Sequence, residues 1–344
     1  MFTCSKHRRR VRQALLACAV AWALSSGAAA LGRTDHPQAA PTPLPEGNTG
    51  IAALYPNDFG IGSNAAVIFT DDFETYGDAN DLWDRWSNVF QMSLTRIATE
   101  GGNVYRGAQA LEFRIPQIDG EISNAVVKNL SPKEEVVFIR YYTRFDAGHY
   151  SVQSNHNGAG VEASYCCPGV PADGTNKFYV GLENSRLSLS EVSPGPTHLY
   201  IYHPEQRSQW GDHWYPDGTV APNTSIPGDF GPAFVPRPNL TVPLGTWHAV
   251  ELMVRVNTPG QADGRIAFWV DGVLKADYPS VRLRDVVTLG IDRVSLSFHI
   301  NGTTPRENLK WYDNVVVARS YIGPLVSAPV PPLDDRLYLP LVRR

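Results

Sequence analysis

The chain has 344 residues, of which 43% are hydrophobic, 10% aromatic and 19% charged, with 29 Gly and 27 Pro. This composition is typical of a globular protein rich in loops and excludes disorder along the whole length. Residues 1–30 hold five of the 30 basic residues and none of the 34 acidic ones, so the remainder carries nine more acidic than basic residues. Because phosphate binding needs clustered Lys and Arg, this excess argues against nucleic acid as a partner.

The first 30 residues have the pattern of a secretory signal peptide. A basic stretch that ends at Arg12 is followed by an apolar run over 14–24 and by small residues up to Ala30. We predict cleavage after Ala30 and a protein that is secreted or held at the cell surface. The apolar run is shorter than the roughly 20 residues that span a bilayer, and no later run is long enough, so no transmembrane segment is expected.

The chain after the signal divides into a linker and one β domain. Residues 31–50 are rich in Pro, Ala and Thr without periodicity, which predicts the linker. Residues 51–325 show short alternating runs separated by Gly, Pro, Asn and Asp, the pattern of an antiparallel sandwich. Asp271-Gly272 is the signal of a two-residue hairpin turn. The clearest strands are 110–115, 136–145, 177–182, 198–203, 248–256, 266–270, 294–300 and 314–318.

Two segments lack periodicity. Residues 203–242 are dominated by Pro, Gly, Asp and Trp, and so long an insertion is usually functional or disordered; Trp210 and Trp214 favour ordered packing or ligand contact. The Pro-rich tail, 326–344, ends in LYLPLVRR, which resembles a short C-terminal tag of many secreted bacterial proteins. A sorting tag and an ordinary edge strand both stay open for this tail.

The outward faces of the predicted strands combine basic and aromatic residues. Alternate residues of a strand point to opposite faces, so each run divides into a core set and an outward set. A groove for an acidic polysaccharide needs rings that stack on sugars and donors for carboxylates. An exposed polar face explains any single residue better, and only the accumulation favours sugar binding. The sugar-binding residues predicted in this way are Arg140, Tyr142, Tyr179, His198, Trp269 and His299.

Hydrolysis and elimination make different demands on a sandwich fold. Retaining glucanases place paired carboxylates about 5–5.5 Å apart on one strand face, in Glu-x-Asp-x-Glu spacing. The chain contains no such spacing. β-Elimination needs a group that neutralises a uronate carboxylate, a base for the C5 proton and an acid for the leaving oxygen. Tyr, Lys, His, Arg and Asn fill these three roles.

Two stretches carry a resemblance to a known family. GTWHAVELMVRVNTPGQADGRIAFWVDGVL, followed by WYDNVVVARSYIGP, resembles the C-terminal half of secreted bacterial polysaccharide lyases of the alginate and glucuronan lyase type. The DDFE sequence at 71–74 and the YYTRF strand fit the same family. The resemblance covers 67–324 and implies an all-β fold, a concanavalin A-like jelly-roll sandwich. It also implies cleavage of a uronate-containing polysaccharide by β-elimination.

The resemblance also suggests active residues. The family carries them on a Lys-x-Pro-Gly loop, a Ser-x-Arg strand and a Tyr-x-Tyr strand, and the last of these matches Tyr200-Ile201-Tyr202, with Tyr as base and acid. The loop falls on 155–158, where Gly158 alone is kept, and the Ser-x-Arg strand falls near 177–179, where both residues are replaced. The residues implied are Tyr200, Tyr202, Lys177 and His156 for catalysis, with Asn155 in substrate binding. A lyase, a non-catalytic carbohydrate-binding protein and a structural surface protein all stay open.

Two smaller sites complete the expectations. Asp72, Glu74 and Asp313 lie on segments that jelly rolls of this type bring together, and they predict a structural Ca²⁺ ion; capping of turns by the same residues stays open. The chemistry itself is expected to need no cofactor. Once the signal is removed, Cys166 and Cys167 are the remaining cysteines, and we predict a vicinal disulfide between them. A reduced pair packed under the neighbouring loop is the alternative.

Overall fold

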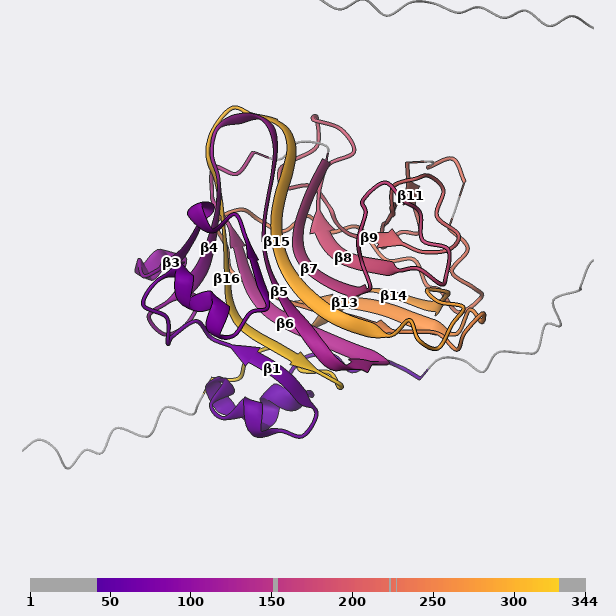
Figure 1. The fold of residues 1–344 in the computed structure, drawn as a ribbon, viewed down its shortest axis with the longest axis horizontal. Coiled ribbons are helices and arrows are strands. Elements are labelled where there is room, and N and C mark those ends of the chain that lie inside the picture. The colour runs from indigo at the N-terminus through magenta and orange to yellow at the C-terminus, as the bar shows by residue number, and fades with distance from the viewer. Residues whose placement is uncertain (1–41, 151–153, 223, 227, 328–344) are drawn as a thin grey trace, which may run out of the picture. The chain divides into compact units, whose positions relative to one another are not determined.

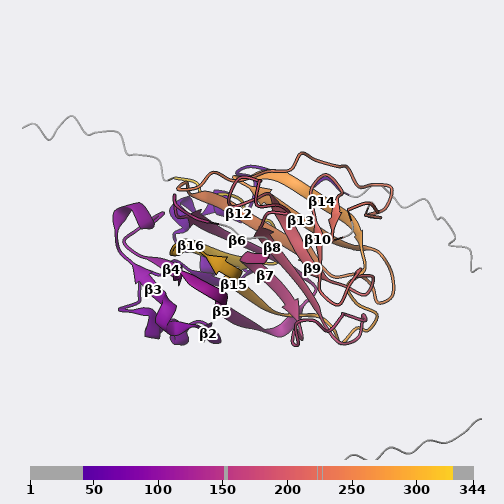
Figure 2. The ribbon, with the colours of Figure 1, turned by 90° about the horizontal axis from the view of Figure 1, so that it is seen from above.

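The described chain folds as two antiparallel β-sheets packed face to face (Figure 2). The structure, a computed structural model, describes residues 42–150, 154–222, 224–226 and 228–327. The predicted signal peptide lies outside these residues. The first part of the predicted linker and nearly all of the predicted tail lie outside them as well.

The first sheet contains eight strands within the described residues. Its order is β14-β13-β12-β6-β16-β4-β3, and β1 pairs with β16 beside this path. The strands are β1 (Val67–Asp71), β3 (Thr95–Ala98), β4 (Ala110–Ile115), β6 (Val136–Phe145), β12 (His248–Arg255), β13 (Gly264–Val270), β14 (Val273–Val281) and β16 (Asn308–Ala318).

The second sheet also contains eight strands within the described ranges, in the order β11-β10-β9-β8-β7-β15-β5-β2. Figure 1 shows β5, β15, β7, β8 and β9 side by side across this curved sheet. The strands are β2 (Asn88–Phe90), β5 (Ile118–Glu134), β7 (Ser154–Ala163), β8 (Phe178–Asn184), β9 (Thr197–Tyr202), β10 (Asp212–Trp214), β11 (Val220–Ala221) and β15 (Ile291–Thr304).

The helices of the described residues are short 3-10 turns near the N-terminal end of the domain. None of them is long and apolar enough to cross a membrane. They are η1 (Ile51–Leu54), η2 (Pro56–Asp58), η3 (Ile61–Ser63), η4 (Ala79–Asp84), η5 (Met92–Leu94) and η6 (Gly101–Asn103).

The main core lies between the sheets because each strand turns alternate residues inward. Leu199 and Ile201 of β9 are fully buried there, as are Ile139, Leu252 and Phe268 from the first sheet. Burying each such side chain stabilises the fold by about 1.5–3 kcal/mol. The inward set of β9 leaves its other residues, including Tyr200 and Tyr202, on the outer face of the second sheet.

The outer face of the first sheet is covered by both ends of the domain. Trp269 of β13 is 1% exposed and packs in a second apolar cluster with Ile51 and Ile322. The indole N–H of Trp269 donates to the Pro45 carbonyl at 2.9 Å. Ordered contacts therefore begin earlier in the chain than the composition predicts, because the segment 42–50 lies against β13 and β14.

Each of the eight predicted ranges overlaps a strand of the structure. Strands 110–115 and 136–145 have the predicted bounds, and Asp271 and Gly272 form the predicted turn, with φ of 52° and 76° and Val270 paired with Val273. Eight strands of the described residues lie outside the predicted ranges: β1, β2, β3, β5, β7, β10, β11 and β14. β5 runs for 17 residues with many exposed polar side chains, so its alternation contains little apolar signal. The all-β jelly-roll prediction is confirmed.

Candidate functional site

The outer face of the second sheet carries a group of ionisable side chains. Glu183 of β8 lies opposite His198 of β9, and Tyr200 of β9 lies opposite His213 of β10. Residues opposite each other on one face have Cβ atoms about 4.5–5.5 Å apart, so the register alone brings these side chains into contact. We call the following six residues the outer cluster: His156, Glu183, His198, Tyr200, His213 and His299.

His156 of β7 binds the carboxylate of Glu183. Its Nδ1 lies 2.9 Å from Oε1 and 2.8 Å from Oε2 of Glu183, which is itself 1% exposed. Burial alone would lower the pKa of His156, but the charge of Glu183 and the hydrogen bond outweigh it and raise the pKa. The pair therefore favours an imidazolium beside a carboxylate.

Burial favours the neutral form of the three other histidines of the outer cluster. His299 lies opposite His156 in the register and stacks on it with ring centroids 4.8 Å apart. Burial, followed by the charge of His156, lowers the pKa of His299 to about 3. Burial also lowers the pKa of His198 and, more strongly, that of His213. Neutral imidazoles offer one nitrogen lone pair each.

Tyr200 lies between two of these histidines. Its ring centroid is 4.5 Å from that of His156 and 4.8 Å from that of His213. Its hydroxyl donates to the Tyr202 hydroxyl at 3.3 Å and accepts the Gly211 backbone N–H at 3.1 Å. Burial, followed by the hydrogen bond with Tyr202, raises the pKa of Tyr200. Tyr200 is 7% exposed and Tyr202 is fully buried, so Tyr200 is the less buried residue of the pair.

Two glycines make room for Tyr179 beside Tyr200. Gly160 of β7 lies opposite Gly181 of β8. A Cβ on Gly181 would lie 2.6 Å from the Tyr179 hydroxyl, and a Cβ on Gly160 would lie 3.0 Å from Cε2 of the same ring. The bare backbone therefore lets the Tyr179 ring lie across the two strands, with its centroid 6.1 Å from that of Tyr200.

The Lys177 side chain binds the backbone of the Cys166-Cys167 pair, next to the outer cluster. The Lys177 ammonium donates to the carbonyls of Cys166 at 2.7 Å and Cys167 at 2.9 Å, and it lies 4.6 Å from the centre of the Tyr202 ring. Lys177 is 1% exposed, and burial lowers its pKa. Its cation is therefore engaged with backbone carbonyls, and its catalytic role stays a prediction.

Cys166 and Cys167 lie on the surface as free thiols. Their sulfurs are 2.9 Å apart, with Cys167 donating to Cys166. The alternative we kept open, thiols packed beneath a loop, does not fit this exposure. The disulfide itself stays a prediction.

Three of the predicted sugar-binding residues lie on the first sheet, away from the outer cluster. Arg140 is fully buried and forms an ion pair with Asp58. Tyr142 stacks on Tyr105 with centroids 3.7 Å apart, and Trp269 is covered by the segment 42–50. We expected exposed side chains here, but both ends of the domain cover this face, which strand alternation does not reveal.

Asn155 lies in β7 next to His156, and its side chain is outside the described part of the structure. His198, Tyr179 and His299 do lie together with His156 and Tyr200, as the sequence predicts.

The structure adds two residues that the sequence analysis missed. Both Glu183 and His213 belong to the outer cluster, and extending the alternation of 177–182 by one residue would have found Glu183.

The predicted calcium ligands bind backbone N–H groups. Asp313 Oδ2 accepts the N–H groups of residues 105 and 106 at 2.9 and 3.1 Å, and Glu74 accepts those of residues 108 and 109 at 3.0 Å. Asp72 accepts the N–H of Glu74 at 3.3 Å. These bonds anchor the loop that precedes β4. The Ca²⁺ ion stays a prediction, and it would compete with these amides.

Comparison with known proteins identifies the fold. No family model and no curated protein matches the sequence. A double mutant of the alginate lyase Aly36B, solved with an alginate trisaccharide, matches with a TM-score of 0.55 over 75% of this chain and 100% of its own, at 16% identity. This chain has the jelly-roll fold of the alginate lyases.

Two further alginate lyases share this fold. The lyase vAL-1 from a Chlorella virus matches with a TM-score of 0.51 and 13% identity, over 74% of this chain and 100% of its own. The PL-14 alginate lyase from Aplysia kurodai matches with a TM-score of 0.51 and 12% identity, over the same shares. The fold predicted from the family resemblance is confirmed.

Proposed function

We propose that this protein is a secreted polysaccharide lyase that cleaves a uronate-containing polymer by β-elimination, with Tyr200 as its proton-transfer residue. The observation that carries the proposal is the place of Tyr200 on the outer face of the second sheet, with its ring between His156 and His213 and its hydroxyl bound to the Gly211 N–H. A phenol in this place exchanges protons with a sugar that lies across β8 and β9.

The reaction balances without a redox partner. The C5–H bond of the uronate breaks, the C4–O bond of the leaving sugar breaks, and a C4=C5 double bond forms. Tyr200, ionised to the phenolate for this step, takes the C5 proton and gives that proton to the released O4. The negative charge that develops beside the carboxylate needs a cation or strong donors in contact with it.

An acidic polymer fits the hydrogen-bond donors of the outer cluster. The His156 side chain is 25% exposed, and its bond to Glu183 favours the imidazolium. Histidine N–H groups form charge-assisted hydrogen bonds with carboxylates. The fold shared with alginate lyases supports the same substrate class.

The test is incubation of the purified protein with a panel of uronate polymers, with absorbance of the unsaturated product as the readout. We expect cleavage of at least one polymer and a loss of about 10²–10⁴-fold in rate for Tyr200→Phe. Because this variant leaves the Gly211 N–H without its acceptor, the free energy of unfolding should fall by about 1–3 kcal/mol. A melting curve of the variant checks that it is folded at the assay temperature.

Tyr105→Phe is the matched control. It removes the same hydroxyl from a tyrosine that stacks on Tyr142 of the first sheet, away from the outer cluster. We expect its rate to equal that of the unchanged protein. The proposal is wrong if no polymer gives an unsaturated product, or if Tyr200→Phe keeps the rate of Tyr105→Phe.

Carbohydrate binding without catalysis is the second candidate. The observation that favours it is the state of Lys177, whose ammonium is held by two backbone carbonyls. Titration calorimetry with the same polymers separates the two functions. Binding with no unsaturated product would favour the binding protein.

Export is part of the proposal and rests on the signal pattern of 1–30. Expression in a host with a secretory pathway tests it. We expect material outside the cytoplasm with a new N-terminus after Ala30. An uncleaved N-terminus on material that stays in the cytoplasm contradicts it.

A further inference from the structure

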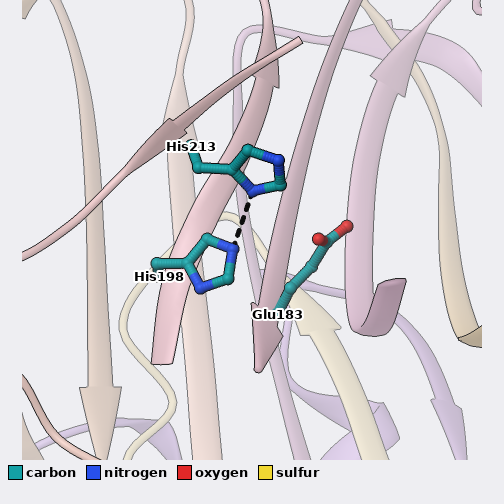
Figure 3. A group of neighbouring side chains, drawn as sticks. All are labelled: Glu183, His198 and His213. Carbon is teal, nitrogen blue, oxygen red and sulfur yellow. Dashed lines mark hydrogen bonds between the residues drawn. The ribbon is translucent and has the colours of Figure 1, made fainter. Parts of the chain in front are cut away.

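Three residues of the outer cluster bring metal-ligand atoms together. Glu183, His198 and His213 each offer one such atom, and these atoms all lie within 4.8 Å of one another. Figure 3 shows the rings of His198 and His213 meeting nitrogen to nitrogen, with the Glu183 carboxylate beside them. The three come from the neighbouring strands β8, β9 and β10, so the sheet ladder fixes their spacing.

The hydrogen bonds of His198 place its proton on Nδ1 and leave the lone pair of Nε2 for a cation. Its Nδ1 lies 3.0 Å from the Pro196 carbonyl, which only accepts, so the proton is on Nδ1. Nε2 then accepts hydrogen bonds, with His213 Nδ1 at 2.9 Å and the Ser185 hydroxyl at 3.4 Å. A ligand histidine in a metalloprotein usually donates its second N–H to a carbonyl or carboxylate in this way.

The surroundings hold the three side chains in place. His198 is fully buried and stacks on Tyr215 with ring centroids 4.7 Å apart, and Glu183 is 1% exposed. His213 is half-buried and is the most exposed of the three. Three protein ligands leave a fourth position free on a tetrahedral ion, as in reactive rather than closed structural metal centres.

We propose that Glu183, His198 and His213 bind a Zn²⁺ ion, and that its open position binds the carboxylate of the uronate substrate. The second half rests on the proposed lyase function, and the first half does not. Two neutral imidazoles and one carboxylate are a ligand set that Zn²⁺ takes in many proteins. On binding, the proton of His213 Nδ1 moves to Nε2, and the ring stays neutral.

The two histidine nitrogens move little, and the wider gaps between ligand atoms, which reach at most 4.8 Å, close by up to about 1.5 Å. Nitrogens bound to one tetrahedral Zn²⁺ at about 2.0–2.1 Å lie roughly 3.3 Å apart, so the 2.9 Å contact opens by about 0.4 Å. One oxygen of Glu183 turns to the metal while the other keeps its bond to His156. That bond then becomes an outer-shell contact that orients the carboxylate.

The site gives the elimination a cation. Among the described residues near Tyr200, Lys177 is engaged with backbone carbonyls and His156 with Glu183. A metal next to His213 lies beside Tyr200, because the two rings have centroids 4.8 Å apart. Coordination of the uronate carboxylate withdraws its charge and makes the C5 proton more acidic.

The first experiment measures metal binding without substrate. The chelator-stripped full chain is titrated with Zn²⁺ by calorimetry and with Co²⁺ by visible absorption, which reports tetrahedral geometry. We expect one ion per chain and an intense Co²⁺ band that Zn²⁺ abolishes. His213→Ala should weaken Zn²⁺ binding by more than the roughly 10–100-fold typical of an outer-shell change. His248→Asn, on the first sheet, is the matched control and should bind as the unchanged protein does.

Absence of binding, an octahedral Co²⁺ spectrum, or equal affinity in His213→Ala and His248→Asn overturns the site. If His213→Ala does not fold, stoichiometry and the Co²⁺ spectrum of the unchanged protein decide. The second experiment measures cleavage after metal removal and after Zn²⁺ is returned. Metal binding without cleavage of any polymer keeps the site and rejects the lyase. Cleavage that is the same with and without metal keeps the lyase and rejects the role of the metal in it.

Discussion

Asp58→Asn tests whether a buried ion pair attaches the N-terminal segment to the sheet. The Arg140 side chain is 1% exposed and that of Asp58 8% exposed, and Arg140 also donates to the Asn314 carbonyl at 3.0 Å. Asp58 has a φ of 58°, a conformation that Asn accepts readily, so the substitution removes the charge without backbone strain.

Removing one partner of a buried pair leaves an uncompensated charge, which costs about 3–5 kcal/mol. The amide oxygen of Asn still accepts one hydrogen bond, so we expect the lower end, about 3 kcal/mol. For a domain of this size that is a fall of roughly 5–10 °C in Tm. Differential scanning calorimetry measures it.

Glu307→Gln is the matched control. Its partner, Arg114, is 53% exposed and Glu307 is 43% exposed, and pairs of this kind contribute about 0–1 kcal/mol. A difference of ~0.5 kcal/mol in the free energy of unfolding shifts Tm by about 1–2 °C in a domain of this size. If the Tm values of the two variants differ by no more than that, Asp58 does not stabilise the fold through Arg140. A separate result also bears on the site: cleavage of a uronate polymer by Asp58→Asn should be unchanged at a temperature where it is folded.

Four further measurements follow from the structure. Burial raises the pKa of Glu251 to about 7. The protonated carboxyl therefore contributes about 3 kcal/mol to the free energy of unfolding below pH 4, and this contribution is lost as the pH rises through 7. A plot of Tm against pH should be flatter for Glu251→Gln, and an unchanged slope contradicts the reasoning. Gly158→Ala should unfold the protein or lower its stability by more than about 3 kcal/mol, because φ is +154° and the new Cβ would lie 1.9 Å from a backbone oxygen; a soluble variant with the same Tm rejects this. Mass spectrometry of the unreduced protein should show Cys166 and Cys167 two hydrogens lighter if the predicted disulfide forms, and two alkylatable thiols reject it. If Asp313 binds the predicted Ca²⁺, EDTA lowers Tm and Ca²⁺ restores it, whereas a Tm indifferent to both removes the ion.

The sequence predicts the sheets better than the site because apolar alternation reports burial and little else. The strand 136–145 has its predicted bounds since one face is apolar throughout. The same alternation places Arg140 and Tyr200 on outward faces, and it contains no information about which outward face is covered by the chain ends. Burial of Arg140 comes from segments more than 80 residues away along the chain.

The candidate site depends on pairing between strands, which single strands do not reveal. Tyr200 was found because its strand has a motif, and His156 because a family loop aligns with it. His213 lies in a stretch of Pro, Gly and Trp where no period marks β10, so its position opposite Tyr200 appears only in the register. Glu183 was missed because the predicted strand ended at residue 182, one residue too early.

The two ends of the domain lie together on the face opposite the outer cluster. The backbone N–H groups of Ile51 and Ala52 donate to the carbonyls of Tyr321 and Ile322 at 3.1 and 2.9 Å. A chain tethered to a surface through either end is therefore held by the back of the first sheet. The second sheet then faces outward, and in the proposed lyase a long polymer would pass across Tyr200 without meeting the attachment point.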